Sequence, residues 1–291
     1  MKTVLVTGGC GFIGSNFIRL LNAETDWRVV NLDKLTYAGN PENVADLPAE
    51  RNRMIHGDIG DRRLVEKVLK EEKPWSIVNF AAESHVDRSI LDASPFVQTN
   101  IGGVQALLDA VRAHPVERFL QISTDEVYGD NEGKAPSGED GPLLPSSPYA
   151  ASKAAADLLC FAYRRTYSLP LIVTRSSNNY GPFQFPEKLI PLLIRNGLSG
   201  LELPVYGDGK QTRDWLYVED NCRAILAVLE KGEIGAIYNI GTGEERTNLE
   251  VVEAVCAAVA EARGSSPAKL KGRIRFVADR PGHDRRYALD T

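Results

Sequence analysis

Cysteine and histidine are both scarce in this chain, with four of each among 291 residues. Cys10, Cys160, Cys222 and Cys256 show no paired spacing, and the histidines lie far apart in the sequence. Disulfide-rich secreted domains and zinc knuckles need cysteines or histidines at short, repeated spacings, so the sequence fits neither class. We therefore expect no metal site, and we expect the reducing environment of the cytoplasm.

Two further absences exclude other classes of protein. No apolar run approaches the roughly 20 residues that a membrane-spanning helix needs, and no apolar signal-type segment follows Met1 and Lys2. Basic residues are not in excess either, because 34 basic and 39 acidic side chains leave a net charge of −5. Proteins that coat nucleic acid or anionic membranes carry a basic excess, so we expect neither partner.

The chain does have the composition of a globular α/β protein, with 43% hydrophobic and 25% charged residues. Up to about residue 175, short β-rich runs alternate with helix-length segments. This alternation predicts a doubly wound, mostly parallel sheet. The expected strands are 3–7, 28–32, 53–56, 76–80, 118–122 and 171–174, and the expected helices are 13–21, 62–70, 95–113 and 150–167.

The pattern changes after residue 175, where loops rich in Gly and Pro become frequent. It predicts a first domain over 1–175 and a smaller α/β lobe over 176–291, covering the carboxyl ends of the sheet where such sheets bind ligands. Segment 130–148 is rich in Gly, Pro, Ser and acidic residues and is expected to form a surface excursion of the first domain. The strands expected in the second lobe are 203–206 and 237–240, and its helices are 187–196, 219–231 and 249–262.

A glycine-rich segment follows the first expected strand. It reads Thr7-Gly-Gly-Cys-Gly-Phe-Ile-Gly14 and places Gly8, Gly11 and Gly14 before an apolar helix. Glycines at this spacing permit a tight turn, the approach of a pyrophosphate to the backbone, and close packing of helix on strand. An ordinary turn is the alternative interpretation.

Asp33 ends the second expected strand, 19 residues after Gly14. An acid near this spacing binds the ribose hydroxyls of a bound dinucleotide and repels a 2′-phosphate. The two features together predict an NAD site, with preference for NAD over NADP, although Lys34 beside Asp33 argues mildly against that preference. A turn or helix cap is the alternative role for Asp33.

Candidate catalytic residues gather in two further segments. Tyr149 and Lys153 lie four residues apart at the start of an expected helix, so both side chains share one face. An adjacent ammonium and a cationic nicotinamide both favour the phenolate, which predicts a base. The preceding strand leads into Thr124-Asp125-Glu126 at the carboxyl edge of the sheet, and an adjacent acid and base suit the removal of water. The alternatives are an amphipathic helix pair and a solvent-facing or capping acidic pair.

These segments together resemble the extended short-chain dehydrogenases, and among them the nucleotide-sugar 4,6-dehydratases of the dTDP-glucose 4,6-dehydratase type. The Thr-Asp-Glu triplet discriminates, because related epimerases share the Tyr/Lys pair and the glycine loop but usually lack the acid pair. Members of the family usually continue well past the last matching motif, whereas this sequence ends at Thr291. Further matching segments are 33–40, 81–89, 177–182, 213–220 and 279–287, so the resemblance covers nearly the whole chain.

The resemblance implies a Rossmann-type first domain and a lyase reaction. The tyrosine matching Tyr149 deprotonates the sugar 4-hydroxyl while NAD takes the C4 hydride, and the lysine matching Lys153 holds the ribose and lowers the tyrosine pKa. The glutamate matching Glu126 then removes the C5 proton, the acid matching Asp125 protonates the departing 6-hydroxyl, and the hydride returns to C6. The threonine matching Thr124 positions the 4-hydroxyl. The expected substrate is a nucleotide-glucose, with dTDP-glucose favoured, and the product is its 4-keto-6-deoxy derivative.

The resemblance also assigns binding residues and a homodimer formed through the helices near 95–113 and 150–167. The expected cofactor residues are Gly8, Gly11, Phe12, Ile13, Gly14, Asp33, Lys34, Leu35, Thr36, Asp58, Ile59, Phe80, Ala81, Ala82, Thr99, Tyr149, Lys153 and Asn179. The expected substrate residues are Ser84, Thr124, Asn178, Lys188, Leu189, Pro204, Val205, Tyr206, Arg213, Asn248, Arg280, His283 and Tyr287.

Two other functions stay open at this point. A nucleotide-sugar 4-epimerase would use the same oxidation but would have no use for Asp125 and Glu126. A catalytically silent, NAD-sensing regulator would tolerate the loss of Tyr149 and Lys153.

Overall fold

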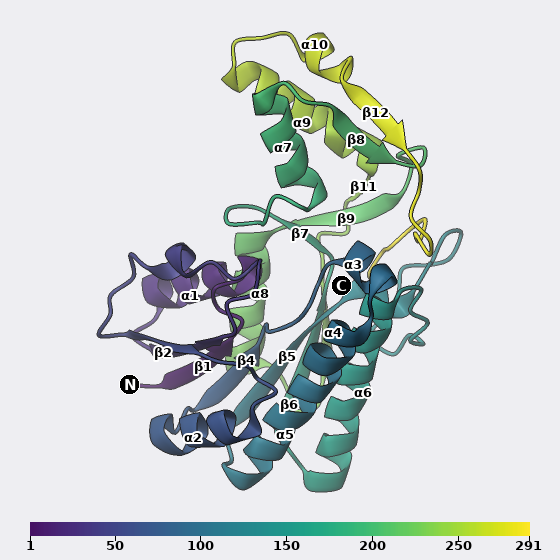
Figure 1. Cartoon of the computed structure of the whole chain (residues 1–291). Coiled ribbons are helices and arrows are strands. Elements are labelled where there is room, and N and C mark those ends of the chain that lie inside the picture. The colour runs from purple at the N-terminus through teal and green to yellow at the C-terminus, as the bar shows by residue number, and fades with distance from the viewer.

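A computed structural model describes all 291 residues and confirms the expected α/β class. Its centre is a seven-stranded sheet with the order β10-β6-β5-β4-β1-β2-β3 (Figure 1). Every neighbouring pair in it is parallel. The strands are β1 (Thr3–Thr7), β2 (Arg28–Asp33), β3 (Asn52–His56), β4 (Ser76–Asn79), β5 (Arg118–Thr124), β6 (Leu171–Ser176) and β10 (Ile237–Ile240).

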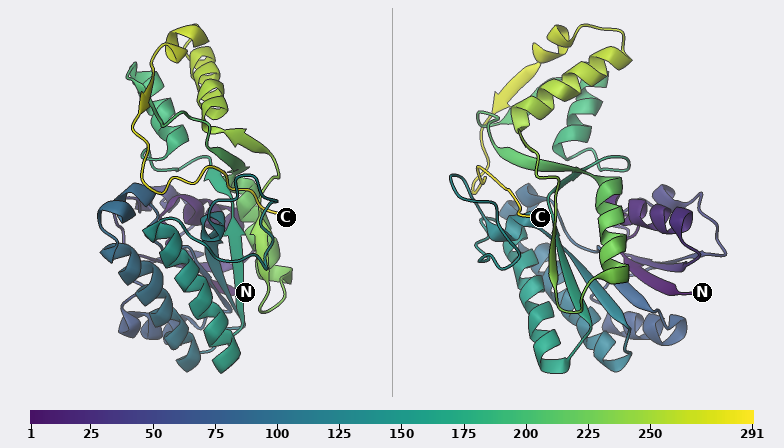
Figure 2. Two further views of the ribbon diagram at one scale, coloured as in Figure 1. Left: turned by 90° about the vertical axis from the view of Figure 1, so that its right-hand side faces the viewer. Right: turned by 180° about the vertical axis from the view of Figure 1, so that it is seen from behind.

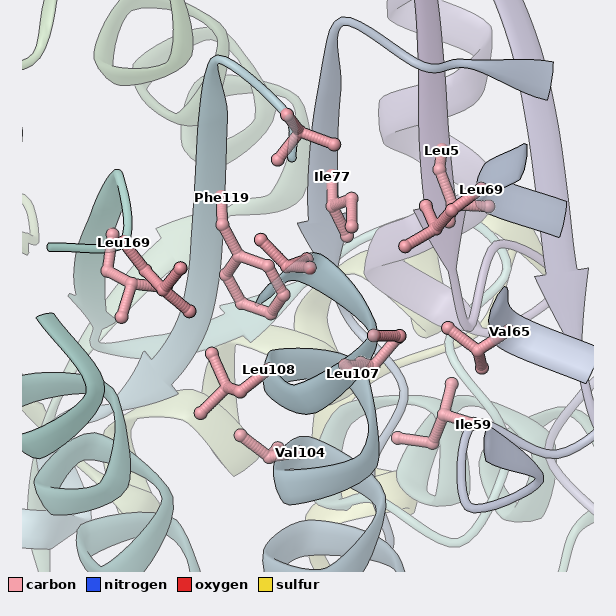
Figure 3. Close-up of a cluster of buried hydrophobic side chains, with 14 of the residues drawn as sticks. Leu5, Ile59, Val65, Leu69, Ile77, Val104, Leu107, Leu108, Phe119 and Leu169 are labelled. Atoms are coloured by element: carbon pink, nitrogen blue, oxygen red, sulfur yellow. The ribbon is translucent and has the colours of Figure 1, made fainter. Parts of the chain in front are cut away.

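Helices cover both faces of this sheet, which explains why its strands read as short apolar runs rather than as alternating patterns. Leu5, Ile77 and Phe119 project from three strands onto Leu107 and Leu108 of a covering helix (Figure 3). One face carries α2 (Arg62–Glu72), α5 (Val104–Ala113) and α6 (Pro148–Tyr167), and the other carries α1 (Phe12–Glu24) and α8 (Val218–Lys231) (Figures 1 and 2).

A smaller group of elements lies beyond the carboxyl ends of the large sheet (Figures 1 and 2). Its own core joins apolar side chains of α7, β8, α9 and α10. A three-stranded sheet contains β7 (Asn178–Tyr180), β9 (Thr212–Tyr217) and β11 (Glu245–Thr247), and a two-stranded sheet pairs β8 (Leu203–Tyr206) with β12 (Ile274–Val277). The helices are α7 (Leu189–Ser199), α9 (Asn248–Ala262) and α10 (Pro267–Lys271).

The strand 237–240 was expected in the second lobe, and that placement is wrong. As β10 it pairs in parallel with β6 at the edge of the large sheet. The helix 219–231 was expected in the second lobe as well, and that placement is also wrong, because as α8 it packs on the large sheet. Ile225 and Leu229 of α8, together with Ile240, belong to the same apolar cluster as Leu120 and Ile172. The tertiary partner of a four-residue strand is set by this packing, which the rhythm of strands along the chain does not show. The division into 1–175 and 176–291 stays a prediction.

Several short helical segments near the sheet edge were not expected from the sequence. The expected helix 95–113 is not a regular α-helix, because a π-helical segment over 97–103 separates its first residues from the rest. The side chain of Asn100 in that segment holds the backbone of Glu83 through hydrogen bonds of 2.9 and 3.0 Å. Such turns are frequent at functional sites. The segments are η1 (Pro41–Val44), α3 (Val86–Leu91), α4 (Ser94–Phe96), the π-helical η2 (Val97–Gly103) and η3 (Asp125–Tyr128).

No helix in the structure combines the length and the hydrophobicity needed to cross a membrane.

Candidate active site

A cleft with about 1250 Å³ of empty space, including its open mouth, lies at the carboxyl ends of the strands. Most of the expected cofactor residues line it, and only Leu35 and Asn179 do not. Two residues expected to bind the substrate, Ser84 and Lys188, line it as well. The lining cofactor residues are Gly8, Gly11, Phe12, Ile13, Gly14, Asp33, Lys34, Thr36, Asp58, Ile59, Phe80, Ala81, Ala82, Thr99, Tyr149 and Lys153.

The glycine loop can only be built with glycine at two of its positions. Gly8 has a φ of +70°, and a Cβ there would lie 2.7 Å from the backbone nitrogen of Ala81. A Cβ on Gly14 would lie 2.3 Å from the carbonyl oxygen of Gly8. Helix α1 then begins with no side-chain cap and no acid in its first turn. Its free N–H groups and positive end therefore face the cleft, which fits the pyrophosphate of a dinucleotide.

The Asp33 carboxylate is fixed at the end of β2 by two backbone donors. Oδ2 accepts the N–H of Cys10 at 2.8 Å, and Oδ1 accepts the N–H of Leu35 at 2.8 Å. These bonds join the glycine loop to the loop after β2. Asp33 therefore accepts backbone hydrogen bonds in a turn and also lines the cleft. Lys34, beside Asp33, forms an ion pair of 2.7 Å with Asp58. Burial by itself would raise the pKa of Asp58, but the pairing with Lys34 lowers that pKa.

The Asp125 carboxyl is buried, with 3% of its surface exposed, directly after β5. Burial and then the charge of Glu126 raise its pKa to about 7, against the opposing charge of Arg213. The Thr124 hydroxyl donates to its Oδ1 at 3.1 Å, while its Oδ2 has no partner. An aspartic acid that stays protonated close to neutral pH can donate a proton.

The neighbouring Glu126 has a different electrostatic environment. Burial raises its pKa, and the charges of Arg280, Lys188 and Arg213 act in the opposite direction. These three cations come from three separate segments of the second half of the chain. Burial thus raises the pKa of both carboxyls, but three cations oppose this at Glu126 and one, Arg213, opposes it at Asp125.

Tyr149 and Lys153 lie on the first turns of α6, and both are buried. The Tyr149 ring packs edge-on against Phe96, with centroids 6.3 Å apart, and its backbone N–H donates to Ser89 Oγ at 3.1 Å. Burial, Glu126 and Asp125 raise the pKa of Tyr149. The Lys153 ammonium donates to the carbonyl of Ile122 at 2.6 Å, and burial lowers its pKa to about 8. Lys153 was expected to favour the phenolate of Tyr149. In the protein without cofactor, burial and the two carboxyls have the larger effect and favour the neutral phenol.

Part of the expected substrate set forms a cationic wall on the second lobe. The Lys188 ammonium donates to the carbonyl of Ser84 at 2.7 Å. Arg213 is buried, and its guanidinium lies 4.1 Å from the centre of the Tyr287 ring and donates to the carbonyl of Asp284 at 2.8 Å. Both cations are therefore held in place by neutral or backbone groups and keep their net charge for a ligand.

A second part of the set is organised around Asp87 of α3. Its carboxylate accepts the Tyr206 hydroxyl at 2.9 Å and lies 3.4 Å from the Arg280 guanidinium. The Nδ1–H group of His283 donates to the Asp279 carboxylate at 2.6 Å, and the His283 ring lies edge-on to Tyr206. The Nε atom of Arg280 has no partner.

The remaining expected substrate residues differ in what they can offer. Val205 is 1% exposed and its side chain belongs to the core of the small lobe, so only its backbone could meet a ligand. Asn178 lies on β7, and its Oδ1 has no partner. Leu189 and Asn248 are the first residues of α7 and α9, and Pro204 lies on β8.

The sequence reasoning missed two groups of polar residues, of which only the second is buried. Glu187 lines the cleft and accepts the Tyr37 hydroxyl at 3.0 Å. Asp157 and Arg175 form an ion pair of 3.0 Å beneath Lys153. Asp157 lies four residues after Lys153, the helical spacing that already marked Tyr149, so the same signal could have found it. No group of three or more His, Cys, Asp or Glu side chains is arranged to hold a metal ion.

Comparison with known proteins agrees with this geometry. The family model described as GDP-mannose 4,6 dehydratase matches residues 5–291. The chain belongs to the GDP-mannose 4,6-dehydratase family. A curated relative, the dTDP-glucose 4,6-dehydratase of Xanthomonas campestris pv. campestris (strain B100), is 52% identical over 302 residues, covering 100% of this chain and 86% of the relative.

Solved structures related to this member of the GDP-mannose 4,6-dehydratase family include dehydratases and epimerases. The dTDP-glucose 4,6-dehydratase DesIV of Streptomyces venezuelae, solved with NAD bound, superposes with a TM-score of 0.92 at 48% identity, covering 99% of this chain and 88% of that one. The UDP-glucose 4-epimerase of Thermus thermophilus, in complex with NAD, has a TM-score of 0.89 at 34% identity, with coverage of 99% and 90%. The overall fold is thus shared by both reaction types, and the site residues must distinguish them.

Proposed function

We propose that this member of the family is an NAD-dependent nucleotide-sugar 4,6-dehydratase that converts dTDP-glucose into its 4-keto-6-deoxy derivative with loss of water. The observation that carries the proposal is the acid pair of buried Asp125 and partly buried Glu126, whose charges act directly on Tyr149. Relatives about half identical to this chain are named dTDP-glucose 4,6-dehydratases, which supports the same substrate.

NAD is the cofactor that the cleft fits. The glycine loop and the N-terminus of α1 would hold its pyrophosphate, and Asp33 would accept hydrogen bonds from a ribose. Because a phosphate beside the Asp33 carboxylate would be repelled, we expect NAD to bind in preference to NADP. When bound, NAD supplies a reversible hydride acceptor for the sugar.

Tyr149 acts as the base that takes the proton of the sugar 4-hydroxyl. Its pKa is raised in the chain alone, so the phenolate needs positive charge nearby, which Lys153 and a cationic nicotinamide supply together. The hydrogen bond to the Ile122 carbonyl holds Lys153 close to the end of β5, and its pKa of about 8 leaves most of it an ammonium at neutral pH. Thr124 lies beside both the acid pair and Tyr149 and orients the same hydroxyl.

Asp125 and Glu126 divide the removal of water between them. Asp125 is the group that donates a proton to the departing 6-hydroxyl, because its pKa, raised to about 7, leaves a large share of it protonated at neutral pH. Glu126 takes the C5 proton, since three surrounding cations favour its ionised form. Two neighbouring carboxyls in different environments are thereby given opposite tasks.

The cationic wall of Lys188, Arg213 and Arg280 is the expected contact for the diphosphate of the nucleotide sugar. Guanidinium groups match phosphate oxygens in charge and geometry. Together with Tyr206, His283 and Tyr287, these groups would orient the sugar toward Tyr149.

The finer expectations on partners and location are part of the same proposal. Four buried cysteines with no disulfide fit a reducing cytoplasm. A homodimer would use the outer surface of η2, α5 and α6, where Val97, Leu158 and Tyr167 are exposed. Sedimentation of the purified protein would test the dimer.

A mass measurement with a matched variant tests the proposed activity. Incubation with dTDP-glucose is expected to give a product lighter by one water. Glu126→Gln should still oxidise C4 but fail to release water, so absorbance of the reduced nicotinamide should build up. Glu132→Gln, an exposed acid of the next loop, should behave as the unaltered protein. Product at the normal rate from Glu126→Gln, or a C4-epimerised sugar from the unaltered protein, would refute the dehydratase assignment.

A further inference from the structure

The pair of buried charges beneath Lys153 has no part in the chemistry described above. Asp157 has no exposed surface and Arg175 has 1% exposed, and neither lines the cleft. Arg175 Nε donates to Asp157 Oδ2 at 3.0 Å. Burying two charges costs free energy that a simple structural role seldom requires, since apolar residues of similar volume often stabilise as well. This cost makes a functional role worth seeking.

Arg175 connects the two segments that carry the proposed chemistry. From β6 it reaches Asp157 on α6, the helix of Tyr149 and Lys153. Its Nη1 also donates to the hydroxyl of Tyr128 at 2.8 Å, and Tyr128 ends η3, the segment that contains Asp125 and Glu126. Tyr128 in turn donates to Asn239 Oδ1 of β10 at 2.9 Å. One guanidinium therefore links the acid pair to the Tyr/Lys pair from the buried side.

Asp157 also acts on the charge of Lys153. Burial lowers the pKa of Lys153, and the charge of Asp157, on the same helix, opposes that effect. From β5, the neighbour of Lys153 is the neutral carbonyl of Ile122. From β6, Arg175 pairs with Asp157 and so acts on Lys153 through that carboxylate. Burial raises the pKa of Asp157 itself, and Arg175 first and then the Ser123 hydroxyl oppose this.

We propose that Asp157 and Arg175 are positioning residues for the C4 oxidation: Arg175 keeps Asp157 ionised, and Asp157 keeps Lys153 an ammonium beside Tyr149. The inference rests on the proposed function, because it assigns these residues to the same reaction. It predicts that Lys153 loses its proton at lower pH once Asp157 is neutral, since a nearby negative charge stabilises the ammonium.

The test measures C4 oxidation alone, in the Glu126→Gln variant, where water loss is blocked. The absorbance of the reduced nicotinamide is followed in a single turnover at a series of pH values. Oxidation needs protonated Lys153, so its rate should fall as pH rises through the pKa of Lys153. Adding Asp157→Asn should move this alkaline limb about one unit toward lower pH, which is a loss of about tenfold in rate on the shifted limb. KM for the nucleotide sugar should stay unchanged, because Asp157 does not reach the cleft.

Two further variants separate positioning from structural support. Asp157→Glu keeps the charge and should keep the alkaline limb in place even if the rate falls. Glu72→Gln removes a buried carboxylate that pairs with Arg28 and Arg53 far from α6, so it should lower the melting temperature without moving the limb. Should Asp157→Asn fail to fold, Arg175→Gln must give the same shift, because Asp157 then loses its counter-charge.

The outcomes separate this inference from the function on which it rests. If the unaltered protein makes no keto sugar, the proposed function fails and this inference fails with it. If the unaltered protein is active but the limb of a folded Asp157→Asn or Arg175→Gln variant stays in place, or only KM changes, the inference alone is overturned.

Discussion

For single residues, burial sets most of the chemistry. Asp125, Glu126, Tyr149 and Lys153 are ordinary ionisable side chains whose pKa values are all displaced first by burial, and only then by their neighbours. Displaced pKa values concentrate at functional sites because proton transfer needs groups that titrate near the working pH. Charge placement then decides which carboxyl is the acid and which is the base.

The pKa of Asp125 leads to a prediction on pH dependence. The group must be protonated to assist the departing hydroxyl, and it loses its proton as pH rises through about 7. The rate of water loss should therefore fall above this pH, before C4 oxidation falls as pH rises through the pKa of Lys153, about 8. Asp125→Asn should slow water loss by roughly 100-fold or more, because the amide cannot transfer a proton. Asp140→Asn, in the surface segment, serves as control, and water loss that stays constant up to alkaline pH would contradict the role.

Among the helices, strands and loops, the positions of loops and helix ends decide how the cofactor is held. Helix α1 can approach β1 only because Gly14 has no side chain, and the π-helical turn of η2 brings Thr99 to the cleft. Glu187 joins three segments over the cleft. Its carboxylate accepts from Tyr37 and lies 3.6 Å from His85 and 3.7 Å from Arg88.

Substitution of Gly14 tests the contact between α1 and the glycine loop. Gly14→Ala places a methyl group 2.3 Å from the carbonyl oxygen of Gly8, so the helix must move away. We expect a loss of about 1–3 kcal/mol in the free energy of unfolding and a clear loss of NAD binding. Calorimetry and NAD titration measure both. Gly138→Ala, where a Cβ meets nothing within 4 Å, should change neither, and normal NAD binding by Gly14→Ala would disprove the close contact.

The contacts of Glu187 predict how firmly NAD is retained. Glu187→Gln weakens three contacts that connect the loop after β2, α3 and the loop before α7 over the cleft. Loss of a charged hydrogen bond typically costs about 1.5–3 kcal/mol, so NAD should dissociate on the order of tenfold faster from the variant. Release can be followed by rapid dilution and fluorescence. Glu202→Gln, an exposed ion-pair residue, is the matched control, and equal release rates from the variant and the control would show that these contacts do not retain NAD.

In the molecule as a whole, the second half of the chain is built into the first. Helix α8 and β10 complete the large sheet layer, while the segments before and after them form the lobe that faces the cleft (Figure 2). The cations of this lobe act on Glu126, which follows β5 in the first half. The catalytic charges therefore depend on the lobe and the sheet folding together.

This arrangement predicts cooperative unfolding. Leu229 of α8 is fully buried in the cluster that also holds Leu120 and Ile172. Leu229→Ala should lower the free energy of unfolding by about 2–5 kcal/mol and shift one single transition seen by calorimetry and by far-ultraviolet circular dichroism. Leu201→Ala, with 55% of the side chain exposed, should leave that transition almost unchanged. Two separate transitions, of which Leu229→Ala moves only one, would show that sheet and lobe unfold independently.

Local sequence patterns account for the elements and for the residue types of the site. Periodicity predicts nearly all the long helices and six strands of the large sheet, because each of these segments repeats its apolar positions locally. The glycine loop and the spacing of Tyr149 and Lys153 are local as well, and so could be read directly. The expected substrate-binding residues outside these motifs followed from the resemblance to the nucleotide-sugar dehydratases, not from the local pattern of residues.

Which distant segments meet is a property of the folded chain. Folding joins β10 to the large sheet, places Glu187 over the cleft, and brings Arg175 beneath Lys153. It also sets the protonation behaviour, since the direction of each pKa shift depends on burial and on charges contributed by residues far away in the chain. Local patterns carry no information on such long-range packing. The acid pair could therefore be found in the sequence. The charges that bear on which member is the acid and which is the base come together only in the folded molecule.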